Sequence, residues 1–335
     1  MGQEIYYISL IILFVNLILF FYIEKLSKIS GILDKPDQKL KIHKYSISNF
    51  GGIFFFLSFL IYFVFLSLSY LYEVNFLNKS ALLIFLISST LIYLLGIFDD
   101  KYNVNYITKF IIFAIILIFL VFSDNQLKIE YLRFTFTDKQ FHLGNYSIIF
   151  SVFCIIVFIN AFNLFDGINL QCGFYYLILS LSLFFIAKST FFLLMIIPTI
   201  FFLILNFKNK VFLGDNGTLL LSFFISYFVI KFYNLKIISS DQIFILMLLP
   251  GIDMLRLFFK RLLNRQNPFK GDRNHLHHYL STKYGIYISN VIIQSLILIP
   301  IILHFGFNLE TPILVILSIF VYSMLIYFHK YKNEK

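Results

Sequence analysis

Two adjacent aspartates, Asp99 and Asp100, follow a long apolar run, and Lys109 lies nine residues beyond the second of them. Adjacent side chains on a helix point about 100° apart, so this pair suits two separate tasks better than one shared proton. One carboxylate could hold a divalent cation while the other faces a nucleophile. The pair could instead cap the next helix and form an ion pair with Lys109.

A second polar group follows another apolar run, where Asn160, Asn163 and Asp166 are spaced three residues apart. This spacing places them on roughly one helical face, where they could bind a nucleobase or a sugar, or hold helices together. Asp215 lies in a glycine-rich turn before a further apolar run. Its carboxylate could cap that helix or bind Mg²⁺.

The longest polar segment carries acidic, basic and histidine side chains between two apolar runs. Those that could bind a substrate are Asp253, Arg256, Asp272, Arg273, His275, His277 and His278. His275 and His278 could ligate a metal ion, but the neighbouring cations would repel it. We therefore favour phosphate recognition, with a solvated basic face as the alternative.

The elements that carry these groups are predicted to be membrane helices. Hydrophobic residues make up 60% of the 335 positions and charged residues 13%, which excludes a soluble protein. The apolar runs are continuous rather than alternating, which favours helices over a β-barrel. About eleven spans are predicted, near residues 5–24, 50–72, 80–98, 106–123, 146–165, 171–187, 189–206, 217–235, 241–258, 287–305 and 311–329. The predicted fold class is an all-α polytopic membrane protein, with one domain over residues 1–335.

The distribution of cations predicts the orientation of these spans. With the N-terminus outside, the inside segments hold all but seven of the 27 Lys and Arg residues, as the positive-inside rule requires. The seven outside are Lys79, Lys128, Arg133, Lys139, Lys188, Lys231 and Lys236. Every polar group described above then faces inside, and the C-terminus is also inside. The net charge of +10 is explained by this topology and by attraction to anionic lipid or substrate, not by nucleic-acid binding.

The first inside loop adds Lys39, Lys41 and His43, and it ends at the pair Gly51-Gly52. Its cations could receive a lipid phosphate or simply bind membrane head groups. The two glycines would let backbone approach closely.

Taken together, these loops resemble the polyprenyl-phosphate N-acetylhexosamine-1-phosphate transferase family, also called glycosyltransferase family 4. The matching motifs run in family order: Asp99-Asp100 with Lys109, Asn160-x-x-Asn163-x-x-Asp166-Gly167, Phe212-Leu213-Gly214-Asp215, Asp253-x-x-Arg256, and Pro268-Phe269-x-x-Asp272-Arg273-x-His275-Leu276-His277-His278. The His-x-His-His form is more similar to the transferases that initiate surface glycans than to the peptidoglycan translocases.

The chain departs from the family pattern in three places. The family's Asp-Gly-x-Asp-Gly ends here in Asn169-Leu170, without the second carboxylate or the second glycine. The first loop is one residue longer than in the family, and Ser48 replaces a proline before the glycine pair. The replacement at Asn169 alters a position where the family usually contacts the nucleotide sugar.

The resemblance implies transfer of a sugar-1-phosphate, by default N-acetylglucosamine-1-phosphate, from a UDP-sugar to undecaprenyl phosphate, with release of UMP. The donor would be UDP-GlcNAc or a related N-acetylhexosamine, and the cofactor Mg²⁺, with Mn²⁺ as a substitute. The enzyme would lie in the bacterial cytoplasmic membrane, in contact with membrane lipid and in some cases as a homodimer. The alternatives are a transporter or flippase of a lipid-linked sugar and a phospho-MurNAc-pentapeptide-type translocase. Few charges lie mid-span, which disfavours transport.

The resemblance also implies roles for the polar residues. Asp215, helped by Asp100, would hold Mg²⁺, and Asp99 would be the family's proposed base for the acceptor phosphate, with Lys109 near the attacking group. The expected substrate-binding residues are Lys39, Lys41, His43, Asn160, Asn163, Asp166, Asp253, Arg256, Asp272, Arg273, His275, His277 and His278. Among these, Asn163 and Asp166 would contact the nucleotide, whereas the histidines and Arg273 would bind phosphate oxygens.

Overall fold

The computed structural model describes residues 2–34, 36, 45–68, 79–266 and 274–333. Within these ranges the helices are α1 (Gly2–Ser30), α2 (Gly52–Leu68), α4 (Lys79–Tyr102), α5 (Tyr106–Ser123), α6 (Ser147–Phe165), α7 (Gln171–Ala187), α8 (Thr190–Phe207), α9 (Gly214–Asn234), α10 (Ser240–Leu263), α11 (Leu276–Phe307) and α12 (Thr311–Asn333). Two antiparallel pairs of strands join β1 (Leu33–Asp34) to β2 (Ile47–Ser48) and β3 (Tyr131–Phe134) to β4 (Thr137–His142).

The prediction of an all-α polytopic membrane protein is confirmed. Nine helices in the described ranges are long and apolar enough to cross a bilayer, and α2 and α7 are shorter apolar helices. Each predicted span corresponds to one described helix, but the ends differ. The helix α4 runs on to Tyr102, and α11 begins at Leu276 rather than near residue 287, with a bend at Gly285. The aspartate pair therefore lies on the last turns of α4, and His277 and His278 lie on the first turn of α11, with His275 as its N-cap residue.

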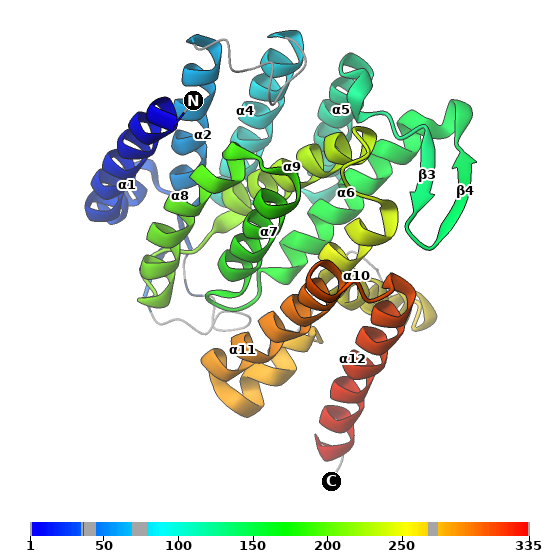
Figure 1. The fold of residues 1–335 in the computed structure, drawn as a ribbon. Helices are drawn as coiled ribbons and strands as arrows, with labels where there is room; N and C mark the ends of the chain where they lie inside the picture. The colour runs from blue at the N-terminus through cyan, green and yellow to red at the C-terminus, as the bar shows by residue number, and fades with distance from the viewer. Residues whose placement is uncertain (1, 35, 37–44, 69–78, 267–273, 334–335) are drawn as a thin grey trace.

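The central helix of the bundle is α9, which packs against α2, α4 and α6 (Figure 1). In the 18-residue stretch of α9 that is long enough to cross a bilayer, 94% of the residues are buried. Aromatic rings supply much of this packing: Phe85 of α4 stacks on Tyr227 at 4.1 Å, and Phe191 of α8 stacks on Phe228 at 4.7 Å. Such pairs add to the stabilisation from buried area, so the core holds α9 firmly in register.

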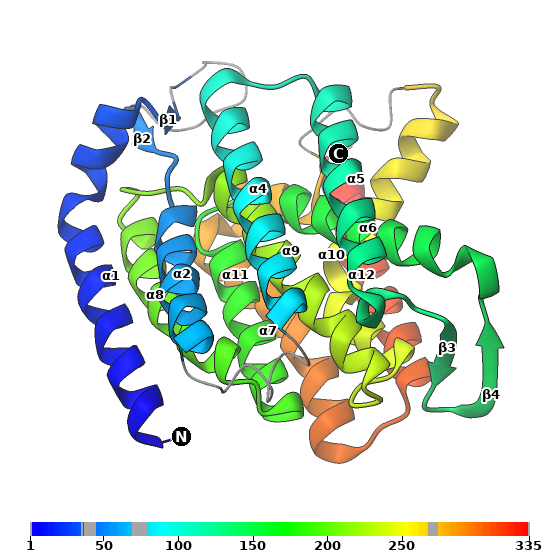
Figure 2. The ribbon, with the colours of Figure 1, turned by 90° about the horizontal axis from the view of Figure 1, so that it is seen from above.

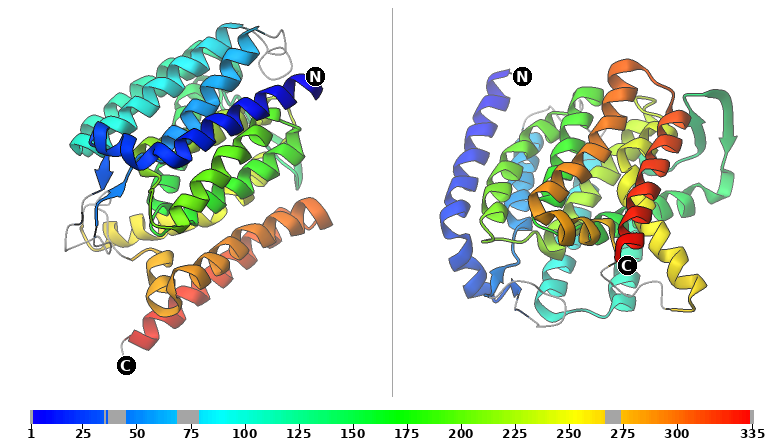
Figure 3. Two further views of the ribbon diagram at one scale, coloured as in Figure 1. Left: turned by 90° about the vertical axis from the view of Figure 1, so that its left-hand side faces the viewer. Right: turned by 90° about the horizontal axis from the view of Figure 1, so that it is seen from below.

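Around this core, α1 packs on α2 and α8, while α5 lies between α4 and α6. The helices α11 and α12 form a pair at one side of the bundle, and α10 links that pair to α6 (Figure 3). Polar helix ends from α4, α6, α9 and α11 can therefore meet where α9 begins.

The two ends of the bundle differ in what they carry. The N-terminus and the β3–β4 hairpin lie at one edge, whereas the α4–α5 turn and the β1–β2 pair lie at the opposite edge (Figure 2). The hairpin occupies the connection between the spans predicted near residues 106–123 and 146–165. The arrangement groups the candidate catalytic residues at the edge predicted to face inside; the orientation in the membrane stays a prediction.

Candidate active site

Two carboxylates from different helices meet on one lysine at the end of the bundle that carries the α4–α5 turn. The Lys109 ammonium, in the first turn of α5, donates to Asp99 Oδ2 at 2.6 Å and also to Asp215 Oδ2. All three side chains are partly exposed, at 22%, 15% and 25% respectively. Asn105 caps α5 by accepting from the Ile107 backbone N–H at 3.0 Å, which fixes the turn that carries the lysine. The cluster has one cation for two carboxylates, so it keeps a net negative charge.

Asp100 makes a different set of contacts from its neighbour. Its two oxygens accept from the backbone N–H groups of Asp215 at 2.9 Å and Asn216 at 2.8 Å. They also accept from the side-chain amides of Asn216 and Asn49, both at 2.6 Å. Asp100 thus caps α9 from α4, where the helix dipole favours an anion. Our alternative interpretation, a cap on the next helix, had the right role but the wrong helix.

Backbone contacts bring the first loop against the start of α9. The Phe212 N–H donates to the Ser48 carbonyl at 2.8 Å, and the Gly51 N–H donates to the Phe212 carbonyl at 3.0 Å. A Cβ at Gly51 would lie 2.5 Å from that carbonyl oxygen, and one at Gly52 would lie 2.3 Å from Asn216 Oδ1. The prediction that these glycines permit close backbone approach is confirmed, and the contact positions Asn49 on Asp100.

The end of α6 joins this cluster through only part of the predicted polar stripe. The Asn163 amide nitrogen donates to Asp215 Oδ1 at 2.7 Å and to Thr218 Oγ1 at 2.8 Å. Asn160 is exposed and donates to the Ile156 carbonyl of its own helix at 2.9 Å. Asp166 is the exposed C-cap residue of α6. The described structure therefore brings Asn163, but not Asn160, onto Asp215, because successive residues three apart drift around a helix of 3.6 residues per turn.

Asp253 lies at the centre of a buried network that joins α10, α11 and α12. Its Oδ2 lies 2.7 Å from His275 Nδ1, and its Oδ1 accepts from Tyr322 Oη at 2.6 Å and from Arg256 at 3.0 Å. The Asp253 and His275 side chains are each 5% exposed. Asp253 and Arg256, which we expect to bind substrate, also support the start of α11 through these contacts.

The three histidines lie together at the start of α11. The rings of His275 and His277 are nearly parallel at 5.3 Å, and those of His277 and His278 lie 4.2 Å apart. His277 is buried against the end of α6: a Cβ added at Gly167 would lie 1.8 Å from its Nε2. Gly167 directly follows the C-cap of α6, so His277 packs against the end of the helix that carries Asn163.

Five of the expected substrate-binding residues lie in segments that the structure does not describe. Lys39, Lys41, His43, Asp272 and Arg273 lie outside the described residues. Among the described residues, sequence reasoning missed Asn49 and Asn216, which hold Asp100, and Tyr322, which holds Asp253. The two asparagines adjoin motif glycines, a signal that could have found them; Tyr322 lies far from any motif.

Asn169, which replaces a family carboxylate, ties the α6–α7 connection to α8. Its amide nitrogen donates to the Asn206 carbonyl at 3.0 Å and to Asn209 Oδ1 at 2.5 Å. The Asn206 side chain in turn accepts from the Leu170 N–H at 2.6 Å. An amide can serve as the donor in these contacts, whereas a carboxylate cannot.

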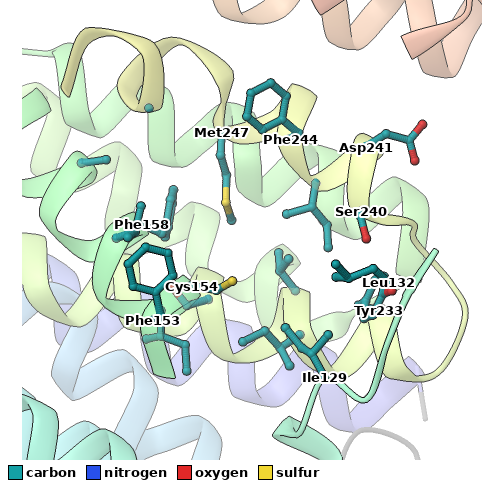
Figure 4. A pocket seen from close by; sticks show the side chains of 18 of the residues that line it. Ile129, Leu132, Phe153, Cys154, Phe158, Tyr233, Ser240, Asp241, Phe244 and Met247 are labelled. Atoms are coloured by element: carbon teal, nitrogen blue, oxygen red, sulfur yellow. The ribbon is translucent and has the colours of Figure 1, made fainter. Parts of the chain in front are cut away.

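An apolar cavity of about 610 Å³ adjoins the site along α6, α9 and α10. Phe153 and Phe158 of α6 and Phe244 and Met247 of α10 line it (Figure 4). The lining includes Leu132 and Phe134 of β3 at one end and reaches Ala161 on α6. The cavity thus runs from the β3–β4 end of the bundle along α6, on a different side of that helix from Asn163.

The donor atoms at the start of α9 fit a hard divalent cation. Within the described residues, His, Cys, Asp and Glu form no group of three or more that could hold a metal alone. Mg²⁺ commonly uses only one or two carboxylates together with waters and substrate phosphates. Asp99 on α4 and Asp215 on α9 both contact the Lys109 ammonium. The space between the two carboxylates therefore already accommodates a positive charge.

Comparison with known proteins agrees with this geometry. The model of glycosyl transferase family 4 matches residues 82–233, which span α4 to α9 and include the Asp99, Lys109, Asn163 and Asp215 positions. The chain is 28% identical over 322 residues to the probable undecaprenyl-phosphate N-acetylglucosaminyl 1-phosphate transferase of Bacillus subtilis, covering 89% of this chain and 82% of that protein. It is 27% identical over 286 residues to the undecaprenyl-phosphate alpha-N-acetylglucosaminyl 1-phosphate transferase of Escherichia coli K12, covering 81% and 74%. Over residues 82–233, this chain is similar to glycosyl transferase family 4.

Proposed function

We propose that this protein transfers N-acetylglucosamine-1-phosphate, or a related sugar-1-phosphate, from a UDP-sugar to undecaprenyl phosphate. The reaction would take place at the inner face of a bacterial cytoplasmic membrane and begin a lipid-linked surface glycan. The single observation that carries the proposal is the convergence of Asp99, Lys109 and Asp215 at one end of the helices. The relatives named above, which match most of the chain, carry this activity in their names.

The reaction joins two anions, so charge neutralisation and alignment dominate it. An oxygen of the acceptor phosphate attacks the phosphorus that carries the sugar. The bond from that phosphorus to the bridging oxygen breaks, and UMP leaves with the bonding electrons. The Lys109 ammonium lies beside both carboxylates and can turn toward incoming phosphate oxygens, while the histidines at the start of α11 offer further donors.

We assign the metal position to Asp215 and Asp99, with the Asn163 amide as a further oxygen donor. Bound there, Mg²⁺ or Mn²⁺ would neutralise charge on the pyrophosphate. Asp100 differs from our first expectation, because both its oxygens already accept N–H groups from α9 and Asn49. We therefore propose that Asp100 is a positioning residue that aims the first turn of α9.

Asp99 is also our candidate for the residue that accepts a proton from the acceptor phosphate. Its Oδ1 accepts the Val104 backbone N–H at 2.9 Å, which fixes its orientation, while Oδ2 faces Lys109. A phosphomonoester has a second pKa near 6, so much of the acceptor is already dianionic at neutral pH. The aid from a base is therefore modest.

The acceptor's hydrocarbon chain requires an apolar path that ends near this cluster. The 610 Å³ cavity along α6 and α10 offers one, since its lining runs along α6 as far as Ala161, four residues before the helix ends at Phe165. A polyprenyl tail in that cavity would present its phosphate toward Asp99 and Lys109 without leaving the bilayer.

The proposal is tested with purified full-length protein in detergent, given undecaprenyl phosphate and a panel of UDP-sugars. We expect release of UMP and formation of a lipid-linked sugar pyrophosphate with UDP-GlcNAc, loss of both products with EDTA, and recovery with Mg²⁺. Asp215→Asn is the inactive control. If no UDP-sugar yields UMP, the transferase proposal is wrong, and the flippase alternative is then measured in liposomes. The polar groups gather at one end of the described helices rather than along a central path, which argues against that alternative.

A further inference from the structure

A polar hollow is lined by residues of the β3–β4 hairpin and of the segments beside it. The hairpin lies at the edge of the bundle opposite the α4–α5 turn (Figure 2). The volume of the hollow is about 350 Å³, within the range of about 300–1,000 Å³ typical of small-molecule sites. Its charged lining in the described chain is Lys128, Arg133 and Lys236, opposed by Glu130. Three cations and one carboxylate leave the hollow with a net positive charge.

This concentration of cations is unusual for the edge on which it occurs. The positive-inside distribution leaves only seven Lys and Arg residues for the predicted outer side, and three of them line this hollow. Lys231 is a fourth member of the seven, but it is 3% exposed and lies 3.2 Å from the equally buried Asp124. Like charges gathered in one hollow repel each other unless an anion joins them.

The cationic side chains are held in place and retain donors for a ligand. The Arg133 guanidinium lies 4.5 Å from the centre of the Tyr233 ring and donates to the Tyr233 carbonyl. A guanidinium has five N–H donors, so one such contact leaves others. The Lys128 ammonium donates to Asn125 Oδ1 at 2.6 Å, and two of its three donors remain.

The strand β3 gives the hollow an apolar neighbour. Side chains of a strand alternate between its two faces. Tyr131 and Arg133 line the polar hollow, whereas Leu132 and Phe134 line the 610 Å³ apolar cavity. Tyr131 is 45% exposed, and Phe122, beside Lys128, is 71% exposed. Exposed aromatic rings of this kind are typical of the membrane–water boundary, where lipid head groups lie.

We propose that this hollow binds the phosphate ester head group of an anionic phospholipid in the leaflet opposite the active site. The shared chemistry is a phosphate anion, but the apolar wall and the aromatic rings favour a lipid over a soluble phosphate. Such a site would hold the hairpin and the end of α9 at the membrane surface. It is independent of the transfer reaction, and its test does not use transfer activity.

The test measures lipid retention by native mass spectrometry, with full-length protein in neutral detergent supplied with phosphatidylglycerol or phosphatidylcholine. We expect several-fold stronger retention of phosphatidylglycerol. The double variant Lys128→Gln/Lys236→Gln should weaken that retention about tenfold, because each interfacial cation contributes substantially to binding of anionic lipid. The matched double variant Lys139→Gln/Lys188→Gln removes the same charge from the same predicted face and should change retention less than about twofold.

Because Lys128 also contacts Asn125, its replacement could lower stability, and the single variant Lys236→Gln serves as a control for folding. This variant should weaken lipid retention several-fold without changing the melting temperature. Three outcomes would overturn the proposal: equal retention of the two lipids, equal loss in both double variants, or binding of glycerol 3-phosphate as tight as that of phosphatidylglycerol.

Discussion

Replacement of Asp100 by Asn distinguishes a helix cap from a metal ligand. The carboxylate accepts four N–H groups, two from the α9 backbone and two from the Asn216 and Asn49 amides. An Asn side chain keeps one oxygen and turns an NH₂ group toward the donors of the other, so two of the four hydrogen bonds are lost. Hydrogen bonds to charged groups contribute about 1.5–3 kcal/mol each, so the loss is about 3 kcal/mol or more.

Asp99→Asn is the matched control, one residue away on the same helix. Asp99 oxygens contact Lys109 and the Val104 N–H, and Lys109 keeps Asp215 as a partner when Asp99 is neutral. The expected change in stability is about 1 kcal/mol or less, because this ion pair is partly exposed. Asp100→Asn should lower the melting temperature by several degrees, whereas Asp99→Asn should leave it nearly unchanged.

The assay combines thermal unfolding in detergent, followed by intrinsic fluorescence, with a titration of Mg²⁺ against UMP release. If Asp100→Asn has the melting temperature of the wild-type protein but needs many times more Mg²⁺ for its residual activity, Asp100 is a metal ligand. Our assignment of Asp100 as a helix cap is then wrong. The same result would restore the expectation we drew from the sequence.

Four further variants test the remaining assignments. Lys109→Met should reduce UMP release about 100-fold or more, because two carboxylates then face each other without a cation, and Lys109→Arg should recover part of the rate. Gly167→Ala should lower the melting temperature, since its Cβ would lie 1.8 Å from His277 Nε2, and adding His277→Ala should raise it again. Asp99→Asn separates the two roles proposed for Asp99: a base predicts near-normal turnover at pH 8 and loss at pH 5.5, whereas equal loss at both pH values indicates metal binding or positioning. Ala161→Phe should raise the KM for undecaprenyl phosphate and affect a short-chain polyprenyl phosphate much less; equal effects on both would contradict a tail in the cavity.

The sequence could predict the spans because each apolar run is long enough to decide its own structure. It could also predict that Asp99 and Asp100 act separately, since adjacent helical residues point in different directions. It could not say where they point: the cap on α9 depends on how α4 packs, and that packing is set by side chains such as Phe85 and Tyr227.

Contacts that join distant helices left no signal in the sequence. Asp253 accepts from Tyr322, 69 residues later, and nothing near either residue predicts the pair. The spacing of Asn160 and Asn163 predicted one face, yet only Asn163 reaches Asp215, because α9 approaches α6 from one side. Helical spacing orders residues on a helix but does not choose its neighbours.

The position of α9 explains how a membrane protein can hold this chemistry. It has the lowest mean hydropathy of the nine described helices that could span, yet it is the most buried. Asp215 at its start and Lys231 near its end would be unfavourable against lipid. Each has partners instead: Lys109 and Asn163 for the first, and Asp124 for the second. Because the surrounding helices separate α9 from lipid, its side chains need not be as apolar as those of a helix that faces lipid. The least apolar span of such a chain is therefore the one to search first for catalytic residues.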